Sequence, residues 1–149
     1  MKVIDGILFV LHGFVGVGAI GGGLAAIIHP KEPLGVSVEA LKYSPFQDFL
    51  IPGIILFTVL GLGNIFSAGL MIRSQSRYQG YISSIFSWAL VIWIVVQAYM
   101  LRNIIFLHIL FFLIGILQGI LSMTILVKNR SFPMDVILDT LKKKRENAS

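Results

Sequence analysis

Cysteine is absent from this sequence of 149 residues. The absence excludes disulfide bonds, thiolate metal sites and cysteine nucleophiles, and it leaves the redox compartment undefined. Charge is scarce as well, because Asp, Glu, Lys and Arg make up 13% of the residues, whereas a soluble domain carries about 25%. A chain with so few charged side chains cannot cover a globular surface with polar groups, so water is not its main solvent.

Apolar residues take the place of the missing charges: they make up 56% of the chain, and the mean hydropathy is +0.89. Four apolar stretches reach the roughly 20 residues that a spanning helix needs. They are Val3 to Ile28, Phe49 to Ile72, Tyr81 to Tyr99 and Ile104 to Val127. Each is apolar at both odd and even positions, unlike the alternating strands of a membrane barrel. We predict an all-α integral membrane protein whose residues 1–128 form an antiparallel four-helix bundle with short connections.

The positions of Lys and Arg predict the orientation of the bundle in the membrane. Three of the twelve basic residues, Lys31, Lys42 and Arg102, fall in the two connections expected on one side. The others flank the opposite ends of the spans, so we expect both termini on the cytoplasmic side. The first apolar stretch is too long for a signal peptide and lacks a small-residue cleavage site, so we expect it to be retained.

The last segment, residues 131–149, reads as a cytoplasmic amphipathic helix with a basic end. Ser131 is placed as its N-cap, with Pro133 in the first turn. Its apolar side chains can lie in the acyl boundary while its basic run contacts anionic headgroups. The residues predicted to contact the membrane surface are Lys142, Lys143, Lys144 and Arg145.

Glycines are concentrated in the first span. Gly16, Gly18 and Gly21 spell the GxGxxG pattern of dinucleotide-binding folds, but that pattern needs a strand before it and a helix opening on it. Inside a spanning helix, glycines instead allow another helix to approach closely, and Gly18 with Gly22 form a small-xxx-small pair. We therefore predict close helix packing in this span, and a homodimer is an open possibility.

Polar residues inside the spans are the candidates for a ligand site or a pathway. At 1.5 Å per residue, four of them fall about 22 to 24 Å from the outer ends of their spans and form one predicted inner layer. This layer consists of His12, Asn64, Ser84 and Gln118. His108 is a fifth candidate, about 8 Å from the outer end of the fourth span. Interhelical hydrogen bonding and ligand contact remain alternative roles for these side chains.

A second group of candidates lies at the outer boundary, which we term the outer lip. It comprises Pro45, Phe46, Asp48, Pro52, Gln97 and Arg102. Pro52 fits the first turn of the second span, and Asp48 fits the positive end of that helix. A rigid helix entry and a rim for a ligand or partner are both compatible with these residues.

Three short motifs carry a resemblance to a known class of proteins. They are SPFxDFLIPG at Ser44 to Gly53, GLGN at Gly61 to Asn64 and WxxVQ at Trp93 to Gln97. With these motifs the chain resembles small four-span bacterial membrane proteins of uncharacterised function. The resemblance implies a four-span fold in a bacterial plasma membrane, and it implies no catalytic residue.

Three classes of function are consistent with these features. The first hypothesis is a non-enzymatic bundle that binds a partner membrane protein or lipid, because small residues and a basic end suit such contacts. The second is a small-molecule carrier or channel that uses the inner polar layer. The third is an oxidoreductase holding a quinone or haem. The sequence gives no HExxH motif and no nucleophile with a base beside it, so we assign no catalytic residue, metal, cofactor or nucleic-acid partner.

Overall fold

The computed structural model describes residues 2–72, 78–128 and 134–146, and every regular element in these ranges is helical. The spanning elements are α1 (Lys2–Ile28), α2 (Leu50–Ile55), η3 (Leu56–Leu62), α3 (Gly63–Ile72), α4 (Gln79–Leu101) and α5 (Phe106–Lys128). The elements α2, η3 and α3 are continuous and together form the second span. With α1, α4 and α5 they give four helices that are long and apolar enough to cross a membrane. The predicted all-α four-helix bundle is confirmed, and its helices support a multi-pass membrane protein.

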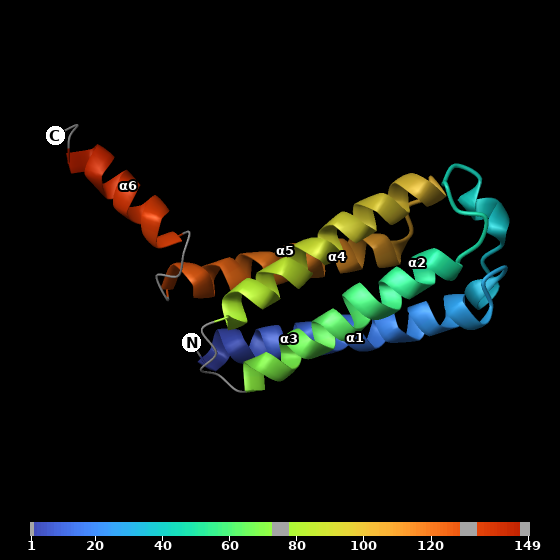
Figure 1. The fold of residues 1–149 in the computed structure, drawn as a ribbon, viewed down its shortest axis with the longest axis horizontal. Helices are drawn as coiled ribbons and strands as arrows, with labels where there is room; N and C mark the ends of the chain where they lie inside the picture. The colour runs from blue at the N-terminus through green and yellow to red at the C-terminus, as the bar shows by residue number, and fades with distance from the viewer. Residues whose placement is uncertain (1, 73–77, 129–133, 147–149) are drawn as a thin grey trace.

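The bundle consists of two helical hairpins packed against each other (Figure 1). In one, α1 runs along the whole of α2–η3–α3, and in the other α4 runs along α5. Contacts of α1 with α5, and of α3 with α4, join the two hairpins. Among the described residues α1 and α4 share no backbone contact, so they lie diagonally across the bundle. Side chains that join α1 to α4 must therefore cross its centre.

Glycines let α1 and the second span come unusually close. A Cβ atom on Gly16 would lie 2.7 Å from the side chain of Ile65, and one on Gly23 would lie 2.7 Å from the backbone nitrogen of Phe57. The predicted pair has looser contacts, since Cβ atoms there would lie 3.4 Å from Phe111 for Gly18 and 3.3 Å from Leu56 for Gly22. Close packing in this span thus depends mainly on Gly16 and Gly23.

The second span changes its winding midway. Its first turn holds Pro52, as predicted, and Gly53 N donates to Phe49 O at 2.8 Å. The segment η3 is a π-helix, whose i→i+5 turns are wider than those of an α-helix and occur often at functional sites. After this wide stretch α3 turns fully buried polar side chains, Asn64 and Ser67, into the bundle.

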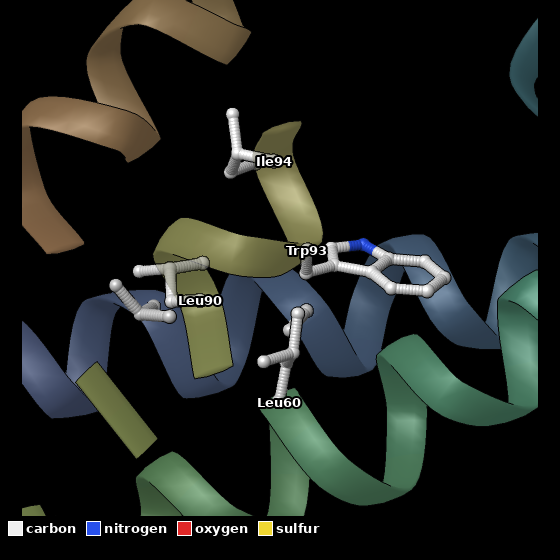
Figure 2. Packing of buried hydrophobic residues seen from close by; sticks show 6 residues of the cluster. Leu60, Leu90, Trp93 and Ile94 are labelled. Carbon is white, nitrogen blue, oxygen red and sulfur yellow. The ribbon is translucent and has the colours of Figure 1, made fainter. Parts of the chain in front are cut away.

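Apolar side chains fill the half of the bundle that lies toward the C-terminal end of α1. The main cluster comprises Val15, Ala19, Leu60, Leu90, Trp93 and Ile94. Figure 2 shows Leu60 of η3 beside Leu90 and Trp93 of α4, which joins the two hairpins. A smaller cluster of Leu8, Met71 and Ile125 lies nearer the N-terminal end of α1. The polar layer described below lies between these two clusters.

The remaining elements lie outside the spans. Two short 3₁₀ helices, η1 (Pro33–Gly35) and η2 (Val38–Leu41), occupy the connection between α1 and α2, and α6 (Met134–Glu146) extends away from the bundle beyond α5 (Figure 1). The predicted N-cap Ser131 and Pro133 lie outside the described residues. In α6, Leu141 and Lys142 to Lys144 are exposed, whereas the side chain of Arg145 is not among those described.

Candidate functional site

His12 is the centre of a buried hydrogen-bond network between three helices. Its Nδ1 lies 2.6 Å from Asn64 Oδ1 on α3, and its Nε2 lies 2.7 Å from Ser83 Oγ on α4. All three side chains are 0% exposed. The bond to Ser83 crosses the bundle diagonal, so it holds the two hairpins together where their backbones do not meet.

The hydrogen-bond partners assign the tautomer of His12. Asn64 Nδ2 donates to Leu60 O at 2.8 Å, so the amide presents its oxygen to His12. An amide oxygen only accepts, and His12 Nδ1 therefore carries the hydrogen. In a neutral imidazole Nε2 is then an acceptor, and the Ser83 hydroxyl donates to it. Each nitrogen of His12 has a matched partner, and neither is left over for a substrate.

Further serines extend the polar layer along the helices. Ser87 Oγ donates to Ser83 O at 2.6 Å, and Ser67 Oγ donates to Gly63 O at 3.0 Å. Ser122 Oγ on α5 donates to Gly119 O at 2.9 Å. All of these serine side chains are fully buried. Bonds of this kind satisfy the hydroxyl hydrogen locally and leave the oxygen able to accept a further bond.

The structure brings together two of the four predicted members of the inner layer, His12 and Asn64. On α4 the residue that meets His12 is Ser83, while Ser84 is half-buried. One residue along a helix rotates the side chain by about 100°, so neighbours at nearly equal depth face different directions. The depth of a residue, which sequence supplies, therefore could not separate Ser83 from Ser84.

Gln118 is the fourth predicted member and stands apart from the others. Its side chain is 0% exposed, and neither Nε2 nor Oε1 has a hydrogen-bond partner among the described residues. An unpaired buried polar group costs about 1–3 kcal/mol. The buried indole nitrogen of Trp93 also lacks a partner in the described part of the chain. Within the described residues, Gln118 is thus the side chain of the predicted layer that has no hydrogen-bond partner.

A second diagonal contact, which sequence reasoning missed, lies near the N-terminal end of α1. Gln79 Nε2 on α4 donates to Asp5 Oδ1 at 2.9 Å and lies 2.8 Å from Met71 Sδ on α3. Asp5 is 8% and Gln79 is 5% exposed. The available signal was Asp5, an acidic residue inside the first apolar stretch. Its partner was missed because the third span was predicted to begin at Tyr81, two residues after Gln79.

His108 has a local role at the start of α5. Its Nδ1 accepts a hydrogen bond from the backbone nitrogen of Ile105 at 3.2 Å, which satisfies a donor at the helix start. The side chain is 8% exposed. His108 therefore caps α5 at the outer end, whereas His12 belongs to the buried layer.

The outer lip is a rigid entry to α2. Asp48 Oδ1 accepts from Leu50 N at 3.0 Å, and Ser44 Oγ accepts from Phe46 N at 3.2 Å. Pro52 is buried, Pro45 is exposed, and Phe46 and Asp48 are half-buried. Phe49 N also donates to Pro30 O at 2.8 Å, which ties α2 to the end of α1. These bonds account for the lip residues of this segment by local structure.

Arg102 joins the connection between α1 and α2 to the end of α4. Its guanidinium carbon lies 4.3 Å from the centre of the Tyr43 ring, and Lys42 Nζ lies 5.6 Å from the same ring. Arg102 ends α4 with a left-handed backbone, at φ 46°. Gln97 is half-buried on α4, one turn before that end. The two cations and the ring link the α1–α2 connection to the end of α4, and no carboxylate approaches Arg102 within salt-bridge distance in the described residues.

Comparisons with known protein families, with curated proteins and with solved structures find no match for the chain. The arrangement must therefore be judged by its own chemistry. The imidazole, amide and hydroxyl groups of the inner layer bind one another or the backbone, as structural contacts between helices do. Gln118 is the exception.

Proposed function

We propose that this protein is a non-enzymatic membrane bundle that binds a transmembrane helix of a partner membrane protein on the lipid-facing side of α1. The observation that supports this function is the division of the glycines on α1. Gly16 and Gly23 serve contacts inside the bundle, whereas a Cβ atom on Gly6, Gly13 or Gly21 would meet nothing within 4 Å.

These open glycines share one side of α1. Gly6 and Gly13 are seven residues apart, which returns a side chain to nearly the same face after two turns. Val10 and Val17 lie at matching spacing and are 64% and 67% exposed. On the lipid-facing side of α1 these glycines and valines therefore alternate along the helix, with the larger exposed side chains of Phe14 and Leu24 beside them. We term this side the α1 outer face.

A helix is a better occupant of the α1 outer face than lipid. Acyl chains pack as well on leucine as on glycine, so glycines give them no advantage. A second helix gains van der Waals contact because small residues let the two backbones approach. Glycine in a helix interior also costs about 1 kcal/mol relative to alanine, a cost that a helix partner can offset.

The same geometry favours binding over a carrier or channel. His12, Asn64 and Ser83 are fully buried and hydrogen-bonded to each other. A polar path through this layer would require breaking the bonds that hold the two hairpins together. The layer thus supports a rigid scaffold on which the α1 outer face is presented.

Site-specific photo-crosslinking tests this function. A photoreactive residue at Val10 is expected to give an adduct with another membrane protein, whereas one at Ile120, 58% exposed on α5, gives none. Gly13→Leu should abolish the Val10 adduct, because its side chain blocks close helix approach. An adduct between two copies of this chain would show that the partner helix comes from a second copy, as in a homodimer. Adducts with lipid alone, or an adduct unaffected by Gly13→Leu, would contradict the proposal.

We further propose that both termini face the cytoplasm of a bacterium and that α6 lies on the inner surface of the plasma membrane. Lys142 to Lys144 are exposed on α6, and the ion pair of Lys142 with Glu146, at 3.9 Å, lies on its surface. Each lysine near an anionic membrane contributes about 1 kcal/mol. Exposed Leu141 would enter the acyl boundary beside them.

Labelling of a single cysteine tests the placement of α6, and the absence of native cysteine makes the labelling specific. Leu141→Cys should react with an impermeant thiol reagent from the cytoplasmic side only. In nanodiscs containing anionic lipid the reaction should slow severalfold relative to neutral lipid. Changing Lys142, Lys143 and Lys144 to glutamine should remove this difference. Equal rates in both lipids for the unmodified helix would show that α6 does not bind the membrane surface.

A further inference from the structure

Gln118 lies opposite a buried serine on the neighbouring helix. Glycine contacts set the relative height of the antiparallel helices α4 and α5. A Cβ atom on Gly115 would lie 2.8 Å from the side chain of Val91, and one on Gly80 would lie 3.0 Å from that of Leu126. Counted from either contact at 1.5 Å per residue, Gln118 and Ser87 lie within about 3 Å of one another along the bundle axis. Both side chains are 0% exposed.

The hydroxyl hydrogens of the serines at the depth of Gln118 are directed to backbone carbonyls. The hydroxyl hydrogen of Ser87 is used by Ser83 O, and that of Ser122 is used by Gly119 O. Each serine oxygen retains lone pairs and can accept a bond. The layer therefore offers acceptor oxygens at the depth of Gln118, and among the described residues neither Oε1 nor Nε2 of Gln118 makes a hydrogen bond.

These unmet groups define the chemistry of the missing partner. It must donate a hydrogen to Oε1 and must be able to accept one from Nε2. A metal cation would meet the oxygen alone, and an anion would meet the amide hydrogens alone. It must also be small, because the side chain is sealed from the surface. A water molecule meets all of these conditions, and buried waters typically bind otherwise unsatisfied polar groups.

We propose that Gln118 binds a buried water molecule that donates to its Oε1 and bridges it to the oxygen of Ser87. Ser87 donates to the backbone of Ser83, which in turn donates from its side chain to His12. The bound water thus connects α5 to the hydrogen-bonded layer of α1, α3 and α4. The polar layer then includes all four spans, as the depths of its residues in the sequence indicate.

Water-selected solid-state NMR of the full chain in lipid bilayers, with ¹⁵N-labelled glutamine, tests this site. Two glutamines of the same chain serve as references: Gln79 is buried and bonded to Asp5, and Gln97 lies half-buried near the outer boundary. Magnetisation from water should reach the side-chain amide of Gln118 severalfold more efficiently than it reaches the side-chain amide of Gln79. With ¹³C-labelled leucine added, the Gln118 signal is identified by correlation to the backbone of Leu117, because Gln79 follows Tyr78 and Gln97 follows Val96.

A volume-matched variant gives a second readout. Gln118→Met removes the amide and its water, and its thermal midpoint should stay equal to or fall below that of the native chain. Transfer to Gln118 no greater than to Gln79 overturns the proposal, because the amide is then dry. A rise in the midpoint for Gln118→Met overturns it as well, since the change would then have removed only unsatisfied groups.

Discussion

Replacing Gly23 with alanine is expected to destabilise the bundle by about 3 kcal/mol, the upper part of the usual range for overpacking. The added Cβ would lie 2.7 Å from both the nitrogen and the Cβ of Phe57 and 2.8 Å from its Cα. Two of these atoms are backbone, so a rotamer change cannot relieve the clash, and α1 must move away from η3. Unfolding in a series of detergent mixtures, followed by circular dichroism, measures the loss.

The matched control lies two residues away. Gly21 is on the same helix and in the same span, but a Cβ there meets nothing within 4 Å. Gly21→Ala should leave stability unchanged or raise it by up to about 1 kcal/mol, because alanine has the higher helix propensity. Equal effects of the two substitutions would show that Gly23 does not mediate the contact between α1 and η3.

Replacing His12 with phenylalanine is the second change with a large expected effect. The ring keeps a similar shape, but Asn64 Oδ1 and the Ser83 hydroxyl lose their partners in a fully buried site. Each of the two stranded groups costs about 1–3 kcal/mol, so we expect a loss of about 2–6 kcal/mol. The same unfolding measurement applies. Ser84→Ala, beside the network and half-buried, should change stability by less than about 0.5 kcal/mol.

A combined variant separates lost bonds from lost packing. When His12→Phe is joined with Asn64→Leu and Ser83→Ala, the unsatisfied groups at both ends of the network are removed together. Apolar replacement of both partners can be nearly neutral, so the triple variant should recover a large part of the stability lost by His12→Phe. If the triple variant instead lost as much stability as the three single variants added together, this account of the layer would be contradicted.

The spans and the depth of the polar layer could be predicted from the sequence, because both depend on distance along a helix. The rise per residue placed His12 and Asn64 at one depth, and the structure joins them at 2.6 Å. The direction of a side chain depends on which faces of the helices meet. The wide winding of η3 alters that direction before Asn64, and no sequence pattern marked it. On α4, Ser83 and Ser84 lie at nearly equal depth, so depth alone did not indicate that Ser83 is the residue that faces His12.

The ends of the spans were a second feature that could not be predicted from the sequence. Apolar residues define where a helix crosses lipid, yet α4 begins with Gln79 and Gly80, both buried by contacts with other helices. Hydropathy assigned Gln79 to the loop, and the Asp5 contact was lost with it. The glycines of α1 show the same limit, because composition counts them alike although Gly23 is enclosed and Gly21 is open. Partners on other helices, which sequence does not give, decide these cases.

The diagonal contacts between α1 and α4 bear on how the protein is made. Ribosomes deliver α1 and the second span to the membrane first, so His12 can meet Asn64 while the chain is still being synthesised. Gln79, which binds Asp5, and Ser83, which binds His12, both lie on α4 and are synthesised later. When the first hairpin enters the bilayer, the carboxyl group of Asp5 and one ring nitrogen of His12 therefore still lack these hydrogen bonds. These groups obtain their remaining hydrogen-bond partners when α4 is inserted. Insertion of the third span is therefore the step that commits the nascent chain to its final packing.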